Sequence, residues 1–107
     1  TILHELSGTC GWDFGVSRTA IPVRTETVMG ADMLGVDPLH LANEGCLVCF
    51  VSEPSTQRAL EVMKSFAISK DAASIGTVLG TTGNGVQTTG GELKIGPLTG
   101  KILPRLC

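Results

Sequence analysis

Two of the four cysteines, Cys46 and Cys49, are separated by two residues, the spacing found in many metal-binding and redox-active thiol pairs. They lie in the apolar run 46–51, whose length and composition predict a buried strand. On a strand, residues i and i+3 point to opposite faces, so these two thiolates could not share one zinc ion or close one disulfide. The sequence therefore favours buried structural thiols, and we expect no metal site.

A third cysteine, Cys107, is the last residue of the sequence. It ends the segment 96–107, which contains two prolines and has no periodic hydrophobic pattern, so we expect a flexible tail. Arg105 places a positive charge two residues before the thiol. From the residues alone two interpretations stay open: a functional nucleophile on a mobile arm, or an incidental cysteine at a chain end.

Other segments match known phosphate-, dinucleotide- or metal-binding motifs only in part. The run 96–101 is one residue short of a phosphate-binding loop and is followed by Ile102 instead of Ser or Thr. The run 83–85, Gly-Asn-Gly, lacks the third glycine of a dinucleotide fingerprint and is typical of a hairpin turn. Neither His4 nor His40 has further ligands at metal-binding spacing. By motif alone, the chain carries no self-contained active site.

Composition limits the classes of protein that remain. A chain of 107 residues with 42% hydrophobic and 17% charged residues is typical of one globular domain and not of a disordered chain. Its net charge of −2, dispersed basic residues and few aromatics argue against nucleic-acid binding. Its apolar runs are far shorter than the roughly 20 residues of a membrane helix. No leader sequence is recognisable, so we expect a cytoplasmic protein that begins, at Thr1, either after processing or inside a longer chain.

The elements that would position these residues alternate between helices and strands. Gly8 and Gly11 should end a first helix, Thr25 should cap the second and Gly35 should end it, and Asp37 should cap a short turn. The helix expected at 54–67 should bury one face, which includes Phe66. We expect helices at 2–6, 26–34, 38–42 and 54–67, and strands at 12–17, 46–51, 73–79, 86–89 and 92–95.

This order predicts an α+β fold, a mixed β-sheet with helices packed on it. Residues 1–95 should form a single domain, and 96–107 an extended C-terminal tail that ends in Cys107.

Five segments together resemble the C-terminal domain of the PurM, or aminoimidazole-ribotide-synthetase, superfamily, and within it the HypE family of hydrogenase maturation proteins. The Asn-Glu-Gly segment is shared across the superfamily, whereas the terminal Leu-Pro-Arg-Leu-Cys is specific to the HypE family. The segments are Ala-Ile-Pro-Val-Arg at 20–24, Met-Leu-Gly-Val-Asp-Pro-Leu at 33–39, Leu-Ala-Asn-Glu-Gly at 41–45, Lys-Asp-Ala-Ala-Ser-Ile-Gly-Thr-Val at 70–78 and Leu-Pro-Arg-Leu-Cys at 103–107.

The resemblance implies a chemistry for the terminal thiol. In the family, a HypF-like carbamoyltransferase loads a carbamoyl group onto the last cysteine, and the S-carboxamide is dehydrated with ATP and Mg to a thiocyanate. The cyano group then passes to iron held by HypC and HypD, as a ligand of the [NiFe]-hydrogenase centre. A thiolate suits both steps, because it is a strong nucleophile and a good leaving group.

By the same resemblance, the catalytic residues here are Cys107, the carrier, and Glu44, a base or its helper. Asn43, Gly45 and Arg105 would contact substrate or nucleotide. At Cys46 the chain departs from the family, which usually has Lys after Glu-Gly.

The family's N-terminal ATP-binding domain is absent from these residues, so we expect this chain alone to bind no ATP and to be inactive. A second hypothesis is a stand-alone, non-catalytic interaction module that reuses the fold. A face left bare by the missing domain would then favour self-association.

Overall fold

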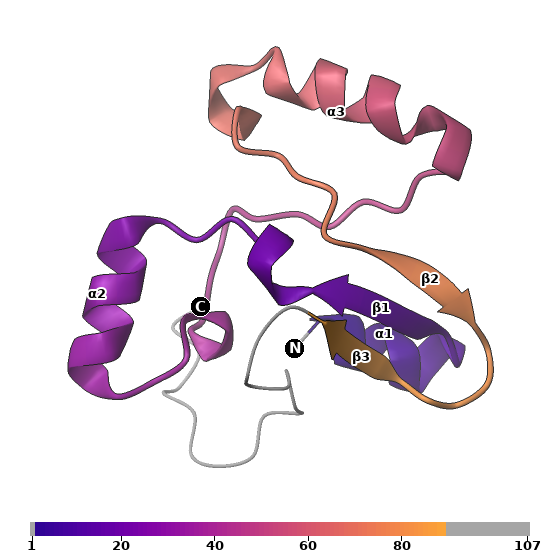
Figure 1. The fold of residues 1–107 in the computed structure, drawn as a ribbon, viewed down its shortest axis with the longest axis horizontal. Coiled ribbons are helices and arrows are strands. Elements are labelled where there is room, and N and C mark those ends of the chain that lie inside the picture. Colours follow the sequence, from indigo (N-terminus) through magenta and orange to yellow (C-terminus); the bar gives the residue numbers. More distant parts are fainter. Residues whose placement is uncertain (1, 90–107) are drawn as a thin grey trace.

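The computed structural model describes residues 2–89 and has the α+β architecture that the sequence predicts. Three α-helices and three strands follow one another in a chain that also contains four single-turn 3-10 helices (Figure 1). The elements are α1 (Ile2–Cys10), β1 (Asp13–Ser17), η1 (Arg18–Ala20), α2 (Thr25–Leu34), η2 (Pro38–His40), η3 (Glu53–Ser55), α3 (Thr56–Lys64), η4 (Ala67–Ser69), β2 (Gly76–Gly80) and β3 (Val86–Thr89).

The sheet is mixed, with β1 in the centre and the strand order β2-β1-β3. β2 pairs with β1 antiparallel, with Val16 opposite Gly76, whereas β3 pairs with β1 parallel, with Phe14 opposite Val86. The segment 81–85 therefore crosses the end of β1 and joins two strands that do not pair with each other. The expected hairpin turn at 83–85 is wrong, although a mixed sheet was predicted correctly.

The core lies on β1. Phe14 and Val16 are 2% and 3% exposed, and Asp13 is 1% exposed. Helix α1 contacts β1 and β3 and lies behind the sheet in Figure 1. A side chain at position 76 would have no room, because a Cβ built on Gly76 would overlap the carbonyl oxygen of Gly15. Glycine at position 76 thus allows β1 and β2 to approach closely.

The first two helices differ from expectation mainly at their ends. α1 continues past Gly8 to Cys10, and Gly11, at φ +70°, follows it. α2 starts at Thr25 itself, with Arg24 at the capping position, and ends as predicted at Gly35 in the left-handed conformation. A glycine tolerates that conformation without the steric cost that a Cβ would add.

Helix α3 does not bury the face that its sequence pattern predicts. Leu60 and Met63 are only half-buried, and Phe66, beyond its end, is 60% exposed. The main tertiary contacts of α3 are with the flanking turns η3 and η4. In Figure 1 the helix stands apart from the sheet, so its apolar side chains find no sheet surface to cover.

The buried strand expected at 46–51 is wrong. These residues are exposed and have no regular secondary structure, and Cys46 and Cys49 are both exposed free thiols. None of the backbone hydrogen bonds between described residues outside helices and strands involves this segment. A strand needs a partner, and residues 2–89 offer it none. Of the expected strand 73–79, only the part from Gly76 onward pairs.

The expected strand 92–95 and the tail 96–107 lie outside the described residues. Within residues 2–89, no helix has both the length and the apolarity needed to cross a membrane.

Candidate functional site

The predicted residues Asn43, Glu44 and Gly45 lie together on an exposed segment after η2. Gly45 has φ +74°, a left-handed conformation that turns the chain just before Cys46. The side chain of Glu44 is exposed, and no hydrogen bond or ion pair to another described residue engages it. Its carboxylate is therefore available to a ligand or to another part of a longer protein.

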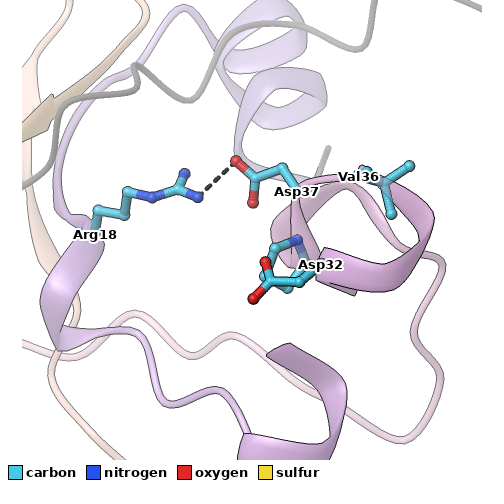
Figure 2. A pocket seen from close by; sticks show the side chains of 6 residues that line it. Arg18, Asp32, Val36 and Asp37 are labelled. Carbon is cyan, nitrogen blue, oxygen red and sulfur yellow. Dashed lines mark hydrogen bonds and ion pairs between the residues drawn. The ribbon is translucent and has the colours of Figure 1, made fainter. Parts of the chain in front are cut away.

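An open pocket of about 360 Å³ lies between η1 and the turn that joins α2 to η2, and its lining residues precede segment 43–45 in the sequence. Its lining is Arg18, Asp32, Gly35, Val36, Asp37 and Pro38. Figure 2 shows Arg18 reaching across the pocket toward Asp37, while Asp32 comes from the end of α2. The volume is at the lower end of the range for small-molecule sites, about 300–1,000 Å³.

Asp37 organises this pocket with two contacts. One carboxylate oxygen accepts a hydrogen bond of 2.5 Å from Nη2 of Arg18, and the other accepts one of 2.9 Å from the backbone N–H of Leu39. The second contact caps η2, as the Asp-Pro sequence predicts. Both charged side chains are largely covered, with Arg18 20% and Asp37 15% exposed.

The pKa of Asp37 reflects opposing influences. Burial raises this pKa, but the hydrogen bonds from Leu39 and Arg18, with the nearby charges of Arg18 and His40, lower it by more. The net result is a pKa below the usual value, so Asp37 is a carboxylate at neutral pH. Among the described residues, Nη1 of Arg18 and Nε2 of His40 are buried polar atoms without a hydrogen-bond partner.

A second carboxylate, Asp13, holds the segment that joins β2 to β3. Oδ2 accepts hydrogen bonds from the backbone N–H and the hydroxyl of Thr82, both at 2.6 Å, and Oδ1 accepts one of 2.7 Å from the N–H of Gly85. The hydroxyl of Thr82 lowers the pKa of Asp13, burial opposes this, and the backbone N–H groups of the segment lower it further. Asp13 therefore has a structural role, because it holds the chain at the point where β3 enters the sheet.

The structure brings together only part of the predicted site. Asn43, Glu44 and Gly45 are contiguous, but none of them lines the pocket at Arg18. Cys107 and Arg105 lie outside the described residues. In residues 2–89, no group of three or more His, Cys, Asp and Glu side chains could hold a metal ion. Within residues 2–89, no glycine-rich loop of the phosphate-binding kind precedes a helix.

Sequence reasoning missed Arg18 and Asp32. Asp37 was identified as a cap, but its ion pair joins residues 19 positions apart, and no local spacing rule connects them. Asp13 was likewise missed, because its partners follow 69 and 72 positions later. The only available signal was an acidic residue inside an otherwise apolar strand, which demands a hydrogen-bond partner when it is buried.

The comparisons with known proteins decide the family. The sequence profile of the family described as "AIR synthase related protein, C-terminal domain" matches residues 3–89. The chain belongs to this family. Its fold and its sequence therefore agree on a C-terminal domain of the AIR synthase type.

Individual relatives are hydrogenase maturation proteins. The chain is 36% identical over 108 residues to the carbamoyl dehydratase HypE of Rhodobacter capsulatus, an alignment that includes 98% of this chain and 32% of the relative. A solved structure of HypE in complex with ATP is 35% identical, with a TM-score of 0.79 over 98% of this chain and 33% of that one. A HypE–HypF complex is 34% identical, with a TM-score of 0.72 over 81% and 28%. The chain thus spans about a third of the length of these relatives.

Proposed function

We propose that this chain acts as the C-terminal part of a HypE-type carbamoyl dehydratase, in which the thiol of Cys107 carries the carbamoyl group. The observation that carries the proposal is the agreement of sequence and fold with HypE over 98% of the chain. The Leu-Pro-Arg-Leu-Cys ending, which resembles that of the HypE family, supports the assignment of the carrier role to Cys107.

The proposed chemistry has two steps on one sulfur. The Cys107 thiolate attacks the carbonyl carbon of an activated carbamoyl group delivered by a HypF-like transferase, the bond from that carbon to the activating group breaks, the activating group leaves with the bonding electrons, and an S-carboxamide remains. ATP, a co-substrate, then phosphorylates the amide oxygen. Loss of phosphate and of both nitrogen protons leaves the thiocyanate. That the solved relatives include a HypE–HypF complex and a HypE–ATP complex supports both co-reactants.

Glu44 is our candidate for the base that takes a nitrogen proton. Its carboxylate is exposed and unengaged within residues 2–89, and Asn43 and Gly45 beside it would contact substrate or nucleotide. Arg105 would place a positive charge near the loaded tail. The thiocyanate would then pass its cyano group to iron on a HypC/HypD-like scaffold, in the cytoplasm. ATP and its Mg would bind in the part of a full-length protein that these residues do not include, so this chain alone is proposed to be inactive.

Loading of the thiol tests this proposal. Full-length protein that contains this chain is incubated with a HypF-type transferase, carbamoyl phosphate and ATP, and intact mass is followed over time. We expect one carbamoyl adduct on Cys107, followed by loss of one water. Cys107→Ala should form no adduct, and Cys10→Ala serves as the matched control that loads normally. An adduct that maps to Cys10, Cys46 or Cys49 would overturn the proposal.

A non-catalytic interaction module is the second candidate function, and one observation favours it. Large apolar side chains are exposed on several elements, with Met33 at 88%, Leu47 at 73% and Ile68 at 98%. Where such side chains form one contiguous patch, that patch marks an interaction site. Sedimentation of the isolated chain over a wide concentration range tests it. A concentration-dependent dimer that Met33→Glu dissociates supports a self-association surface, and a monomer throughout rejects it.

A further inference from the structure

The Cys46–Cys49 pair is the nucleophilic cluster that the proposed chemistry leaves unused. Both thiols are free and exposed, and two residues separate them. The resemblance to the HypE family does not account for them, because that family usually has Lys where Cys46 stands. Their function must therefore be argued from their own surroundings.

The backbone around the pair decides what the thiols can do. A disulfide needs Cα atoms about 4.4–6.8 Å apart, whereas residues i and i+3 of an extended chain lie about 10 Å apart. In a paired strand, hydrogen bonds on both sides would hold the extended form and prevent closure. Segment 46–51 has no regular secondary structure and makes no such bonds to residues 2–89, so closure of the Cys46–Cys49 turn would break no backbone hydrogen bond within that part of the chain.

One feature favours closure over reaction of each thiol by itself. The ring to be closed is short, so the second thiol meets the first at a high effective concentration. Among residues 2–89, no third His, Cys, Asp or Glu joins the pair to form a metal-binding group.

We propose that Cys46 and Cys49 form a redox-active dithiol, which closes to a reversible intramolecular disulfide by exchange with a small disulfide of the glutathione class. The thiolate of one cysteine attacks a sulfur of the oxidant, which forms a mixed disulfide and releases one glutathione thiolate. The thiolate of the other cysteine attacks the protein sulfur of that mixed disulfide and releases the second glutathione thiolate. The two protein thiols lose two protons and two electrons, and one oxidised glutathione becomes two reduced ones. The site does not rest on the proposed carbamoyl chemistry.

The test uses the full chain with Cys10 and Cys107 both replaced by Ser, so that only the pair can react. The protein is equilibrated in buffers of increasing oxidised-to-reduced glutathione ratio, quenched in acid and mapped by peptide mass. We expect a peptide that has lost two hydrogens and bridges Cys46 and Cys49, and that returns to the dithiol on reduction. Single variants Cys46→Ser and Cys49→Ser should each trap the remaining thiol as a glutathione adduct.

Three results would contradict the proposal. If the variant that keeps only Cys46 and Cys49 accumulates glutathione adducts with no internal bridge, the segment does not close and the proposal is wrong. If both thiols stay reduced at the most oxidising ratio while a short unstructured peptide with the same Cys-Leu-Val-Cys sequence is oxidised, the proposal is also wrong. The same experiment on the parent chain, with all four cysteines, must give the 46–49 bridge, and bridges to Cys10 or Cys107 instead would overturn it.

Discussion

The carboxylate of Asp13 accepts two hydrogen bonds of 2.6 Å from Thr82, one from its backbone N–H and one from its hydroxyl, across 69 positions of sequence. Together with the bond from Gly85, this contact determines where the chain passes between β2 and β3. The strand β3 can then pair with β1 in parallel, in place of a hairpin with β2. One buried acidic side chain thus holds the segment that joins β2 to β3 at the end of β1.

Asp13→Asn tests this role through its pH dependence. The pKa of Asp13 lies below the ordinary value of 3.8, so the folded state holds the charged form better than the unfolded state does. Its stabilising effect is fully present well above pH 4 and is lost as the pH falls through the folded-state pKa. We expect the Tm of Asp13→Asn to be lower than that of the parent by about 5 °C or more at pH 7. The difference should shrink in thermal melts between pH 4 and pH 2, and a constant difference across this range would contradict the assignment.

Thr82 offers a matched pair for the same contact. Thr82→Val keeps the shape of the side chain and removes the hydroxyl that donates to Asp13, whereas Thr82→Ser keeps the hydroxyl. We expect Thr82→Val to lower Tm by a few degrees and Thr82→Ser to change it much less. Equal effects in a thermal melt would mean that packing, and not the hydrogen bond, matters at this position.

The approach of β1 and β2 is tested at Gly76. A Cβ there overlaps the carbonyl oxygen of Gly15, and backbone atoms cannot move aside without loss of the strand pairing. We expect Gly76→Ala to lower the free energy of unfolding by about 1–3 kcal/mol, the usual range for overpacking. Gly8→Ala is the control, because nothing lies within 4 Å of its Cβ and it is inside α1. It should raise stability by about 0.5–1 kcal/mol in urea unfolding. Equal and small effects at both sites would contradict the close approach.

The ion pair in the pocket is tested by a double-mutant cycle on Arg18 and Asp37. Arg18→Met removes the charge but keeps an unbranched side chain, and Asp37→Asn keeps a group that can still accept from Leu39. Because both partners are largely covered, we expect a coupling free energy of about 0.5–2 kcal/mol in urea unfolding at pH 7. The pKa of Asp37 is lowered, so the coupling should fall as the pH drops through that pKa, below about 4. Additive effects of the two substitutions would show that the pair contributes nothing.

The role of Glu44 is tested by Glu44→Gln in the full-length protein. A base that takes a nitrogen proton accelerates its step by about 10²–10⁴-fold, and the amide has nearly the same shape without the basicity. We expect carbamoyl loading of Cys107 to remain near the parental rate and the ATP-dependent loss of water to slow by that factor. Glu53→Gln, which removes the same charge at another exposed position, is the control. Dehydration at the parental rate would show that Glu44 is not the base.

Local chemistry in the sequence determined much of this fold. The Gly35 terminus of α2, the Asp37 cap of η2 and the strands at 13–17 and 86–89 all follow from backbone preferences or periodicity within a few residues. The likeness to HypE could also be identified from the sequence, because it rests on short contiguous segments whose residues can be compared without knowledge of the fold. The same segments suggested Glu44 and Cys107, whose roles stay predictions.

Tertiary structure alone decided what depends on distant partners. The apolar run 46–51 has the composition of a strand, but strand formation needs hydrogen bonds to another segment, and residues 2–89 supply none. The pattern of α3 predicts a buried face, but burial needs a surface to pack against. Asp13 and Arg18 became structural residues only when the fold brought Thr82 and Asp37 to them. A sequence specifies its local conformations through nearby atoms, whereas pairing and burial depend on contacts between residues that lie far apart along the chain.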